Sequence, residues 1–195
     1  LKKRFENKNL DESYFDKKVN QANEQLNYLS KTIDDFKEFY TISKEKEIFS
    51  VKDAILNATT ILSADLKSHN IDLETSFETF DEVKIFGVKS ELSQILIAII
   101  SNSIDVLKNI KNPEIQIDIF SSSAEVIIKL ADNGGGIKAK NLKKIFEPYF
   151  STKEEGTGIG LYLAKMIIEE SFGGKILVEN KKEGVLFSLF IEKAL

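Results

Sequence analysis

The chain has 195 residues, 42% of them hydrophobic, which is enough apolar material to bury a core. Its formal net charge is −4, so it is not expected to bind nucleic acid or a membrane surface, and a polyanionic ligand would need positive charge gathered at one site. The absence of cysteine excludes disulfides and thiolate metal sites and is compatible with a reducing cytosol.

The first long pattern is a heptad repeat, in which apolar residues recur at alternating intervals of four and three. Its members are Phe15, Val19, Ala22, Leu26, Leu29, Ile33, Phe36 and Tyr40. A narrow seam of this kind predicts a helix that packs lengthwise against other helices, in a bundle or a homodimer. A lone amphipathic helix lying on its own domain is the alternative. The charged segment Leu1 to Asn9 carries no signal-peptide pattern, and because Leu1 is not Met we expect a fragment of a longer protein.

Polar residues from Thr41 to Glu47 separate this helix from the rest of the chain. They predict a domain boundary that divides the chain into 1–46 and 47–195. Ser50 to Asp53 then has the pattern of a capping box, which predicts that a new helix begins there.

A strongly apolar helix is predicted from Ser90 to about Asn109. Because Leu92 to Leu107 is apolar almost all round, we expect it to lie buried against a sheet. Within it the polar residues Asn102 and Asp105 stand three apart, on one helix face. Ile95 to Ile100, the longest purely apolar run of the chain, is far too short to span a bilayer.

Short stretches with alternating apolar residues predict the strands. They cover 71–77, 83–88, 114–120, 125–130, 175–179 and 185–191. A last helix is predicted from Ile159 to Ser171, with Gly173-Gly174 as its C-terminal cap. This order predicts an α+β fold, a two-layer α/β sandwich whose sheet is mixed or antiparallel and carries helices on one face.

Two glycine clusters lie near the C-terminal end, at 132–137 and 156–161, with Phe146 to Lys153 between them. Glycine lets backbone amides approach a phosphate closely. The second cluster runs into the last helix, so its amides are expected at a helix N-terminus, where an anion is favoured. The sequence contains neither a P-loop nor a dinucleotide-binding glycine motif after its first strand.

Taken in order, these boxes resemble the ATP-binding domain of sensor histidine kinases. They are Asn102, Asp132-x-Gly134-x-Gly136, the phenylalanine-rich box and Gly156-x-Gly158-x-Gly160. That domain belongs to the GHKL group, which includes gyrase B, HSP90 and MutL. The resemblance covers about 48–193 and implies the Bergerat fold. Asp105 stands where many relatives carry Lys or Arg, and resembles the nitrogen-regulatory subset of these kinases.

The resemblance implies roles for individual residues. Asp132 would accept a hydrogen bond from the adenine amino group, and as a pure acceptor it would favour adenine over guanine. Asn102 would bind Mg²⁺ between the ATP phosphates through its amide oxygen. Lys153 would reach the terminal phosphates from a lid over 138–156. The further nucleotide contacts implied are Asp105, Gly134, Gly136, Ile137, Phe150, Thr157, Gly158, Gly160 and Leu161.

Each of the three principal residues also has a purely structural explanation. Asp132 could simply be a turn residue, because Asp is common in turns before glycines. Asn102 would then be a satisfied buried polar group or a surface residue, and Lys153 a solvated loop lysine. Phe146, Tyr149 and Phe150 are expected to anchor the lid or to contact the phosphoacceptor helix.

Two departures from the family pattern bear on function. Ala98 stands four residues before Asn102, where hydrolytic GHKL proteins carry a glutamate base and many sensor kinases carry Asn. Without that base, phosphoryl transfer to another group is favoured over ATP hydrolysis. The only histidine of the chain, His69, lacks the phosphoacceptor motif and is expected at the surface, at a helix end.

The resemblance therefore implies the catalytic portion of a sensor histidine kinase, with ATP and Mg²⁺ as cofactors. Leu29 to Phe36 resembles the second helix of the dimerisation and histidine-phosphotransfer hairpin, so the acceptor histidine is expected upstream of Leu1. The implied partners are a second copy through the N-terminal helix and a response regulator receiver domain, with no direct membrane contact. The expected location is the cytoplasm, in a soluble protein or in the cytoplasmic part of a membrane-bound sensor. The alternatives are a GHKL ATPase that acts as a conformational clamp, and a non-catalytic nucleotide-binding dimerisation module.

Overall fold

The main sheet has five strands in the order β2-β4-β5-β7-β6 in the computed structural model, which describes residues 12–40, 45–77, 83–153 and 156–193. The strands are β2 (Asp72–Phe77), β4 (Glu114–Ser121), β5 (Glu125–Asp132), β6 (Lys175–Asn180) and β7 (Val185–Glu192). β2 pairs with β4 in parallel, and the other pairs are antiparallel. The predicted mixed sheet is thereby confirmed.

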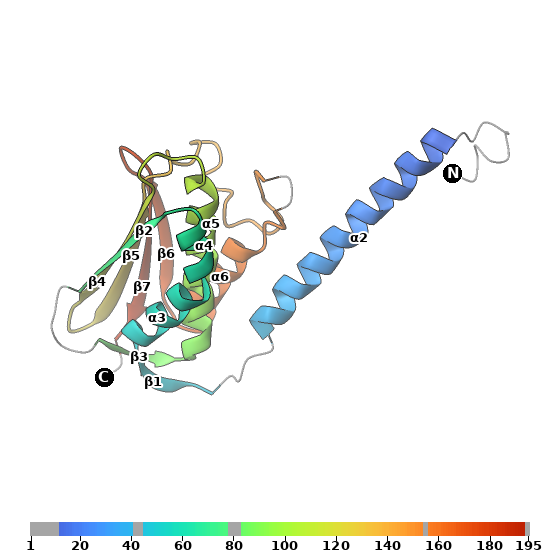
Figure 1. The fold of residues 1–195 in the computed structure, drawn as a ribbon. Helices are drawn as coiled ribbons and strands as arrows, with labels where there is room; N and C mark the ends of the chain where they lie inside the picture. The colour runs from blue at the N-terminus through green and yellow to red at the C-terminus, as the bar shows by residue number, and fades with distance from the viewer. Residues whose placement is uncertain (1–11, 41–44, 78–82, 154–155, 194–195) are drawn as a thin grey trace.

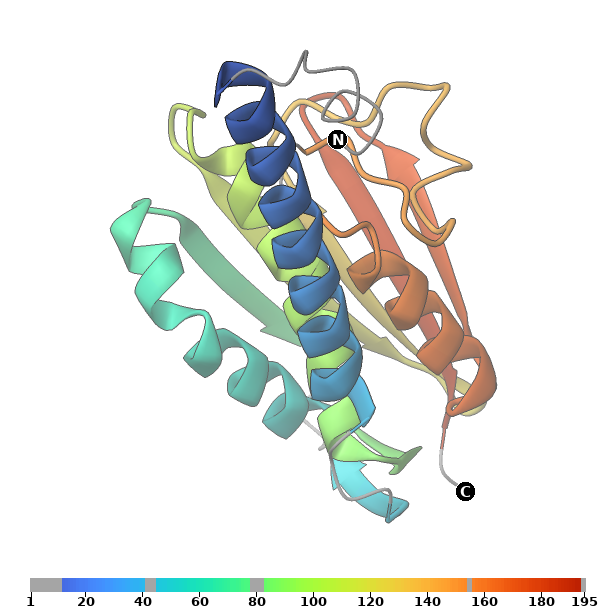
Figure 2. The same ribbon diagram turned by 90° about the vertical axis from the view of Figure 1, so that its right-hand side faces the viewer.

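Four helices cover one face of this sheet (Figure 1). They are α3 (Val51–Ile61), α4 (Ser63–Ser68), α5 (Lys89–Leu107) and α6 (Gly160–Glu170). Figure 2 shows α5 in the middle of this layer, with α3 and α4 on one side of it and α6 on the other. The period-two isoleucines of β4, Ile115, Ile117 and Ile119, are all buried. The two layers of the predicted α+β sandwich are therefore held together by the apolar face of the sheet.

α5 is the central helix of the core. Leu92, Ile95, Leu96, Ile99 and Ile100 have no exposed surface. Of the helices in the described part of the chain, α5 alone is long and apolar enough in composition to cross a membrane, and more than half of the apolar stretch is buried inside the domain. Its composition is therefore explained by packing between the sheet and two flanking helices.

A second, two-stranded sheet lies at the end of the domain and pairs β1 (Glu47–Ser50) with β3 (Lys84–Gly87). β3 was expected from the sequence, whereas β1 was not. α3 begins just after Ser50, as predicted, but the predicted capping bond is wrong, because the Ser50 side chain makes no hydrogen bond to the helix. Strand pairing with Lys84 fixes the Ser50 backbone, and the Val51 amide donates to the carbonyl of Val83.

The heptad pattern forms α2 (Glu12–Tyr40), which extends away from the two layers (Figure 1). The helix itself is confirmed. Phe15, Val19 and Leu26 of the seam are exposed, which leaves the first half of the seam without an apolar partner among the described elements. Leu1 to Asn9 lies outside the described residues.

Candidate nucleotide-binding site

The predicted site residues meet where α5, the end of β5 and the start of α6 come together. Ser103 on α5 hydrogen-bonds to Asp132 at the end of β5. A Cβ added to Gly160, the first residue of α6, would lie 3.7 Å from the Ala98 methyl group of α5. The strand and helix termini converge here because the two layers pack face to face, so residues far apart in sequence share one edge.

Asp132 is held with its carboxylate fixed by two donors. The Ser103 hydroxyl donates to Oδ2 at 2.9 Å, and the amide of Gly134 donates to Oδ1 at 3.0 Å. An ionised carboxylate has about four lone-pair positions, so both oxygens can accept further hydrogen bonds. The arrangement presents a rigid acceptor at the end of the strand, as recognition of an amino group requires.

The loop after Asp132 is fixed by a side chain from the opposite hairpin. Asn180, the last residue of β6, accepts from the Ile137 amide at 2.8 Å and donates to the Ile137 carbonyl at 2.7 Å. Gly136 has a φ of 85°, and a Cβ there would lie 3.1 Å from the Asn180 side chain. Gly134 in turn leaves room for Val106 of α5, whose methyl group would be 2.5 Å from an added Cβ. Glycine is thus required in this loop both for backbone conformation and for close approach.

Asn102 is oriented by the helix that carries it. Its Nδ2 donates to the Ala98 carbonyl at 2.7 Å, which directs Oδ1 away from the helix axis. Oδ1 accepts a hydrogen bond from the Lys153 ammonium at 2.9 Å. The amide oxygen is therefore already in contact with a cation. Such an oxygen is also a suitable ligand for a hard metal ion such as Mg²⁺. Within the described residues no group of three or more His, Asp or Glu side chains forms a separate metal site.

Lys153 also contacts Asp105, and the two form an ion pair. Lys153 Nζ lies 2.6 Å from Asp105 Oδ2, while Lys108 Nζ lies 2.7 Å from Oδ1. Burial raises the pKa of Asp105, but the hydrogen bonds and charges of Lys108 and Lys153 outweigh it and hold that pKa below its ordinary value. The hydrogen bond and charge of Asp105 raise the pKa of Lys108. Asp105 therefore stays ionised at neutral pH, between two cations.

The second glycine cluster packs closely between the Phe150 backbone and the start of α6. Gly158 has a φ of 67°, and a Cβ there would lie 2.6 Å from the backbone of Phe150. The chain then enters α6, whose first amides are free of intrahelical partners by the geometry of any helix. Thr157, next to Gly158, is buried. The first amides of α6 form the helix N-terminus that the sequence predicted, where an anion is favoured.

The segment from Lys138 to Phe150 is a chain of consecutive turns anchored by aromatic side chains. The Phe146 ring packs edge-on against Phe187 of β7, with centroids 6.5 Å apart. Phe150 packs partly buried against the core. Both rings therefore fix this segment to the domain core, whereas Tyr149 is 60% exposed, with a φ of 64°.

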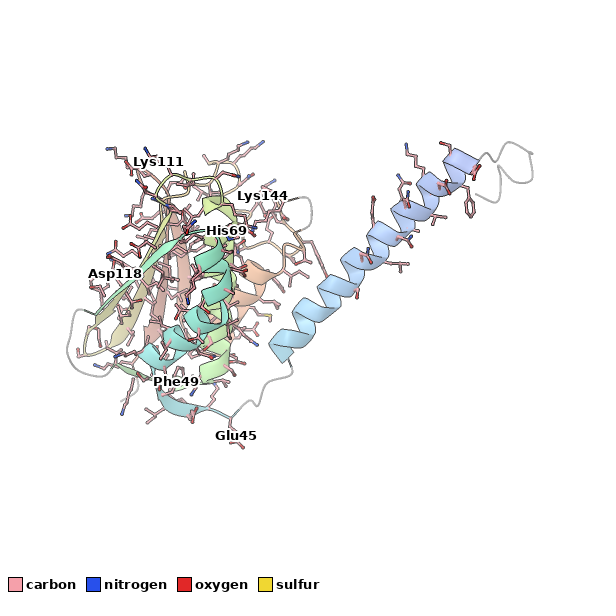
Figure 3. The ribbon with its side chains drawn as sticks, in the orientation of Figure 1. Glu45, Phe49, His69, Lys111, Asp118 and Lys144 are labelled. Carbon is pink, nitrogen blue, oxygen red and sulfur yellow. The ribbon has the colours of Figure 1, made fainter. Side chains whose placement is uncertain are left out.

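His69 lies at the C-terminal end of α4, as predicted (Figure 3). Its Nδ1 is 2.9 Å from the Ser68 hydroxyl and 2.9 Å from the Asp65 carbonyl. The ring thus belongs to a local arrangement at the end of α4.

Sequence reasoning overlooked three residues that shape the site. Ser103 orients Asp132, Asn180 fixes the loop at Ile137, and Val106 lies against Gly134 with 47% of its surface exposed. Ser103 had a detectable signal, because it is a second polar residue beside Asn102 in an apolar helix. Asn180 had none, since an asparagine before a hairpin turn is common for local reasons.

The chain is similar in sequence and in fold to known proteins. The family model described as "Histidine kinase-, DNA gyrase B-, and HSP90-like ATPase" matches residues 87–195. Sporulation kinase C of Bacillus subtilis (strain 168) is 29% identical over 141 residues, which are 72% of this chain and 32% of that protein. The chain thus spans about a third of the length of this curated relative.

Two solved structures are also similar. The catalytic domain of the histidine kinase ThkA superposes with a TM-score of 0.70 at 29% identity, covering 76% of this chain and 96% of that domain. ThkA in complex with the response regulator protein TrrA gives a TM-score of 0.69 at 23% identity, with 96% of this chain and 54% of that chain covered.

Proposed function

Because the chain belongs to the family of histidine kinase-, DNA gyrase B- and HSP90-like ATPases, we propose that it transfers the γ-phosphoryl group of ATP to a histidine, as the catalytic portion of a sensor histidine kinase. ATP binding is a property of the family domain, and the two-layer fold matches a histidine kinase catalytic domain. The acceptor histidine, the metal and the protein partners belong to the proposal.

The observation that carries the proposal is the side chain at position 98. Ala98 lies against Gly160 at the start of α6, one helical turn from Asn102. A carboxylate there would be placed to activate a water molecule beside the terminal phosphates, and a methyl group cannot accept a proton. The site is thus suited to transfer of the phosphoryl group to an incoming nucleophile rather than to hydrolysis.

Asp132, Asn102 and Lys153 would divide the recognition of the nucleotide among them. Asp132 would select adenine by accepting from its amino group, and the amides at the start of α6 would bind the phosphates. Asn102 Oδ1 would hold Mg²⁺, which would neutralise phosphate charge when bound. Lys153 would supply a further positive charge to the terminal phosphates.

A sensor histidine kinase of this kind would have two protein partners, a second copy of itself and a response regulator. Residues 1–46 would contribute to a dimerisation and histidine-phosphotransfer hairpin and 47–195 would form the catalytic domain, with α2 as the homodimer contact. The solved complex of ThkA with a response regulator supports a receiver domain as the final phosphoryl acceptor. Such a kinase portion would work in the cytoplasm, whether or not the whole protein is anchored in a membrane.

The test uses a separate histidine-bearing hairpin fragment whose binding to this chain has first been measured. With γ-labelled ATP and Mg²⁺, we expect acid-labile phosphate on the fragment. An Asn102→Ala chain serves as the matched control and should give none. Absence of label on a fragment that demonstrably binds would contradict the proposal.

A further inference from the structure

We propose that Asp105 is a positioning residue that holds the Lys153 ammonium on the Asn102 oxygen, so that Lys153 and a divalent cation compete for that oxygen. This inference rests on the proposed role of Asn102 as the metal ligand. It assigns to Asp105 a function that is distinct from contact with the nucleotide.

The side chains of Asn102, Asp105 and Lys153 form one connected group. Asn102 and Asp105 lie on one face of α5, and Lys153 reaches both from the lid, at 2.9 Å and 2.6 Å. A lysine ammonium has three donors around a compact charge, so it can satisfy two acceptors at once. Since Asp105 is the charged and closer partner, its bond is the stronger of the two. The carboxylate is therefore what keeps the ammonium beside Asn102.

Two cations on one oxygen repel each other, so Lys153 and a metal ion compete for Asn102 Oδ1. The Asn102 Nδ2 group is a donor and is bonded to the Ala98 carbonyl, so Oδ1 is the one atom of this side chain that can accept a hydrogen bond or bind a metal. A Mg²⁺ ion binds oxygen at about 2.1 Å. An ammonium on the same oxygen would lie within a few ångströms of the metal, where like charges repel strongly. Metal binding at Asn102 therefore favours departure of Lys153 from that oxygen, and the strength of the contact between Lys153 and Asp105 sets the free-energy cost of this departure.

Lys108 competes with Lys153 for the Asp105 carboxylate. Its ammonium lies 2.7 Å from Asp105 Oδ1, so the negative charge of Asp105 is shared between Lys108 and Lys153. Lys153 and Asp105 are 40% and 35% exposed, and exposed ion pairs are weak. A weak, shared contact can be displaced by a divalent cation. Lys108→Met should therefore tighten the hold on Lys153, whereas Asp105→Asn should loosen it.

The first experiment is hydrogen exchange in the unliganded protein, without nucleotide or metal. The Lys153 amide donates to the Ser151 hydroxyl and reports on this part of the lid. We expect its exchange to be about two- to fivefold faster in Asp105→Asn, unchanged or slower in Lys108→Met, and restored in Asp105→Glu. Equal exchange in Asp105→Asn and the unmodified chain, or faster exchange in both variants, would overturn the proposal.

The second experiment measures the Mg²⁺ concentration that half-saturates ATP binding. Asp105→Asn should lower it in the unmodified background and leave it unchanged in a Lys153→Met background, because the carboxylate acts through the lysine. An equal decrease in both backgrounds would overturn the proposal, since it would mean that Asp105 acts on the ligand by charge alone. A chain that binds no Mg-ATP at all would refute the proposed function, while the exchange result would still decide whether Asp105 positions Lys153.

Discussion

Ser103 Oγ lies 2.9 Å from Asp132 Oδ2 and joins the central helix to the end of the strand that carries the glycine loop. Ser103 is buried and directly follows Asn102 in α5. One turn of α5 therefore orients both the proposed metal ligand and the proposed adenine acceptor. The base-binding and phosphate-binding parts of the site are thus coupled through a single rigid element.

Replacing Ser103 by alanine tests this coupling. The loss of one hydrogen bond to a carboxylate is expected to weaken ATP binding by about 1–2 kcal/mol, because Asp132 would be less firmly oriented. Calorimetry with Mg-ATP measures the change. Asp132→Asn is the comparison and should reduce the preference for ATP over GTP, which Ser103→Ala should retain. Unchanged ATP affinity in Ser103→Ala would show that Gly134 alone orients the carboxylate.

The two glycines at the start of α6 should respond oppositely to alanine. Gly158→Ala places a Cβ 2.6 Å from the Phe150 backbone at a positive φ, and is expected to cost about 2 kcal/mol of unfolding free energy. Gly160→Ala meets its nearest atom at 3.7 Å and is expected to be neutral or to stabilise by up to about 1 kcal/mol. Urea denaturation of both variants measures the difference. Equal stabilities would refute the steric account of Gly158.

Asn180 should matter for the glycine loop although it lies on the far hairpin. Asn180→Ala removes both hydrogen bonds to Ile137 and is expected to destabilise the protein by about 1 kcal/mol and to weaken ATP binding. Asn180→Asp keeps the acceptor for the Ile137 amide and should have an intermediate effect. Thermal unfolding with and without Mg-ATP separates the two contributions. An effect of Asn180→Ala on stability but not on ATP affinity would show that the loop keeps its shape without this bridge.

The ion pairs of Asp105 should give stability a specific pH dependence. The pKa of Asp105 in the folded protein lies below the ordinary 3.8, so its pairing stabilises the fold fully above that pH and is lost as the pH falls through the folded pKa. The difference in unfolding free energy between the unmodified chain and Asp105→Asn should therefore be constant between about pH 6 and 8. It should shrink below about pH 3.8. A difference that already varies around neutral pH would point to another titrating group.

Most of the fold could be predicted because the apolar pattern of each segment agrees with the face that the segment buries in the folded domain. Alternating apolar residues in β4 and β5 predicted both strands, and the nearly uniform apolar character of α5 predicted that it lies buried against the sheet. β1 could not be predicted from its four residues, because its pairing with β3 is a long-range contact. The same contact explains why the capping pattern at Ser50 failed, since strand pairing fixes the backbone there.

The site could be predicted where residue type and spacing are tied to chemistry. Asn102, Asp132 and Gly158 belong to that group, and the structure brings the elements that carry them together. The bridge between Asn180 and Ile137 depends on how two hairpins face one another, which no local pattern encodes. The pairing of Lys153 with Asp105 joins residues 48 positions apart and likewise follows only from the assembled fold.

The central claim is transfer to a histidine rather than to water, and partition of the label within one reaction tests it most directly. The chain, γ-labelled Mg-ATP and a bound histidine-bearing hairpin are incubated together, and label on the hairpin is compared with label released as free phosphate. With Ala98 in place of a base, we expect label to accumulate on the hairpin and phosphate release without the hairpin to stay at background. Steady phosphate release without the hairpin, abolished by Asn102→Ala, with no label on the hairpin, would contradict the claim.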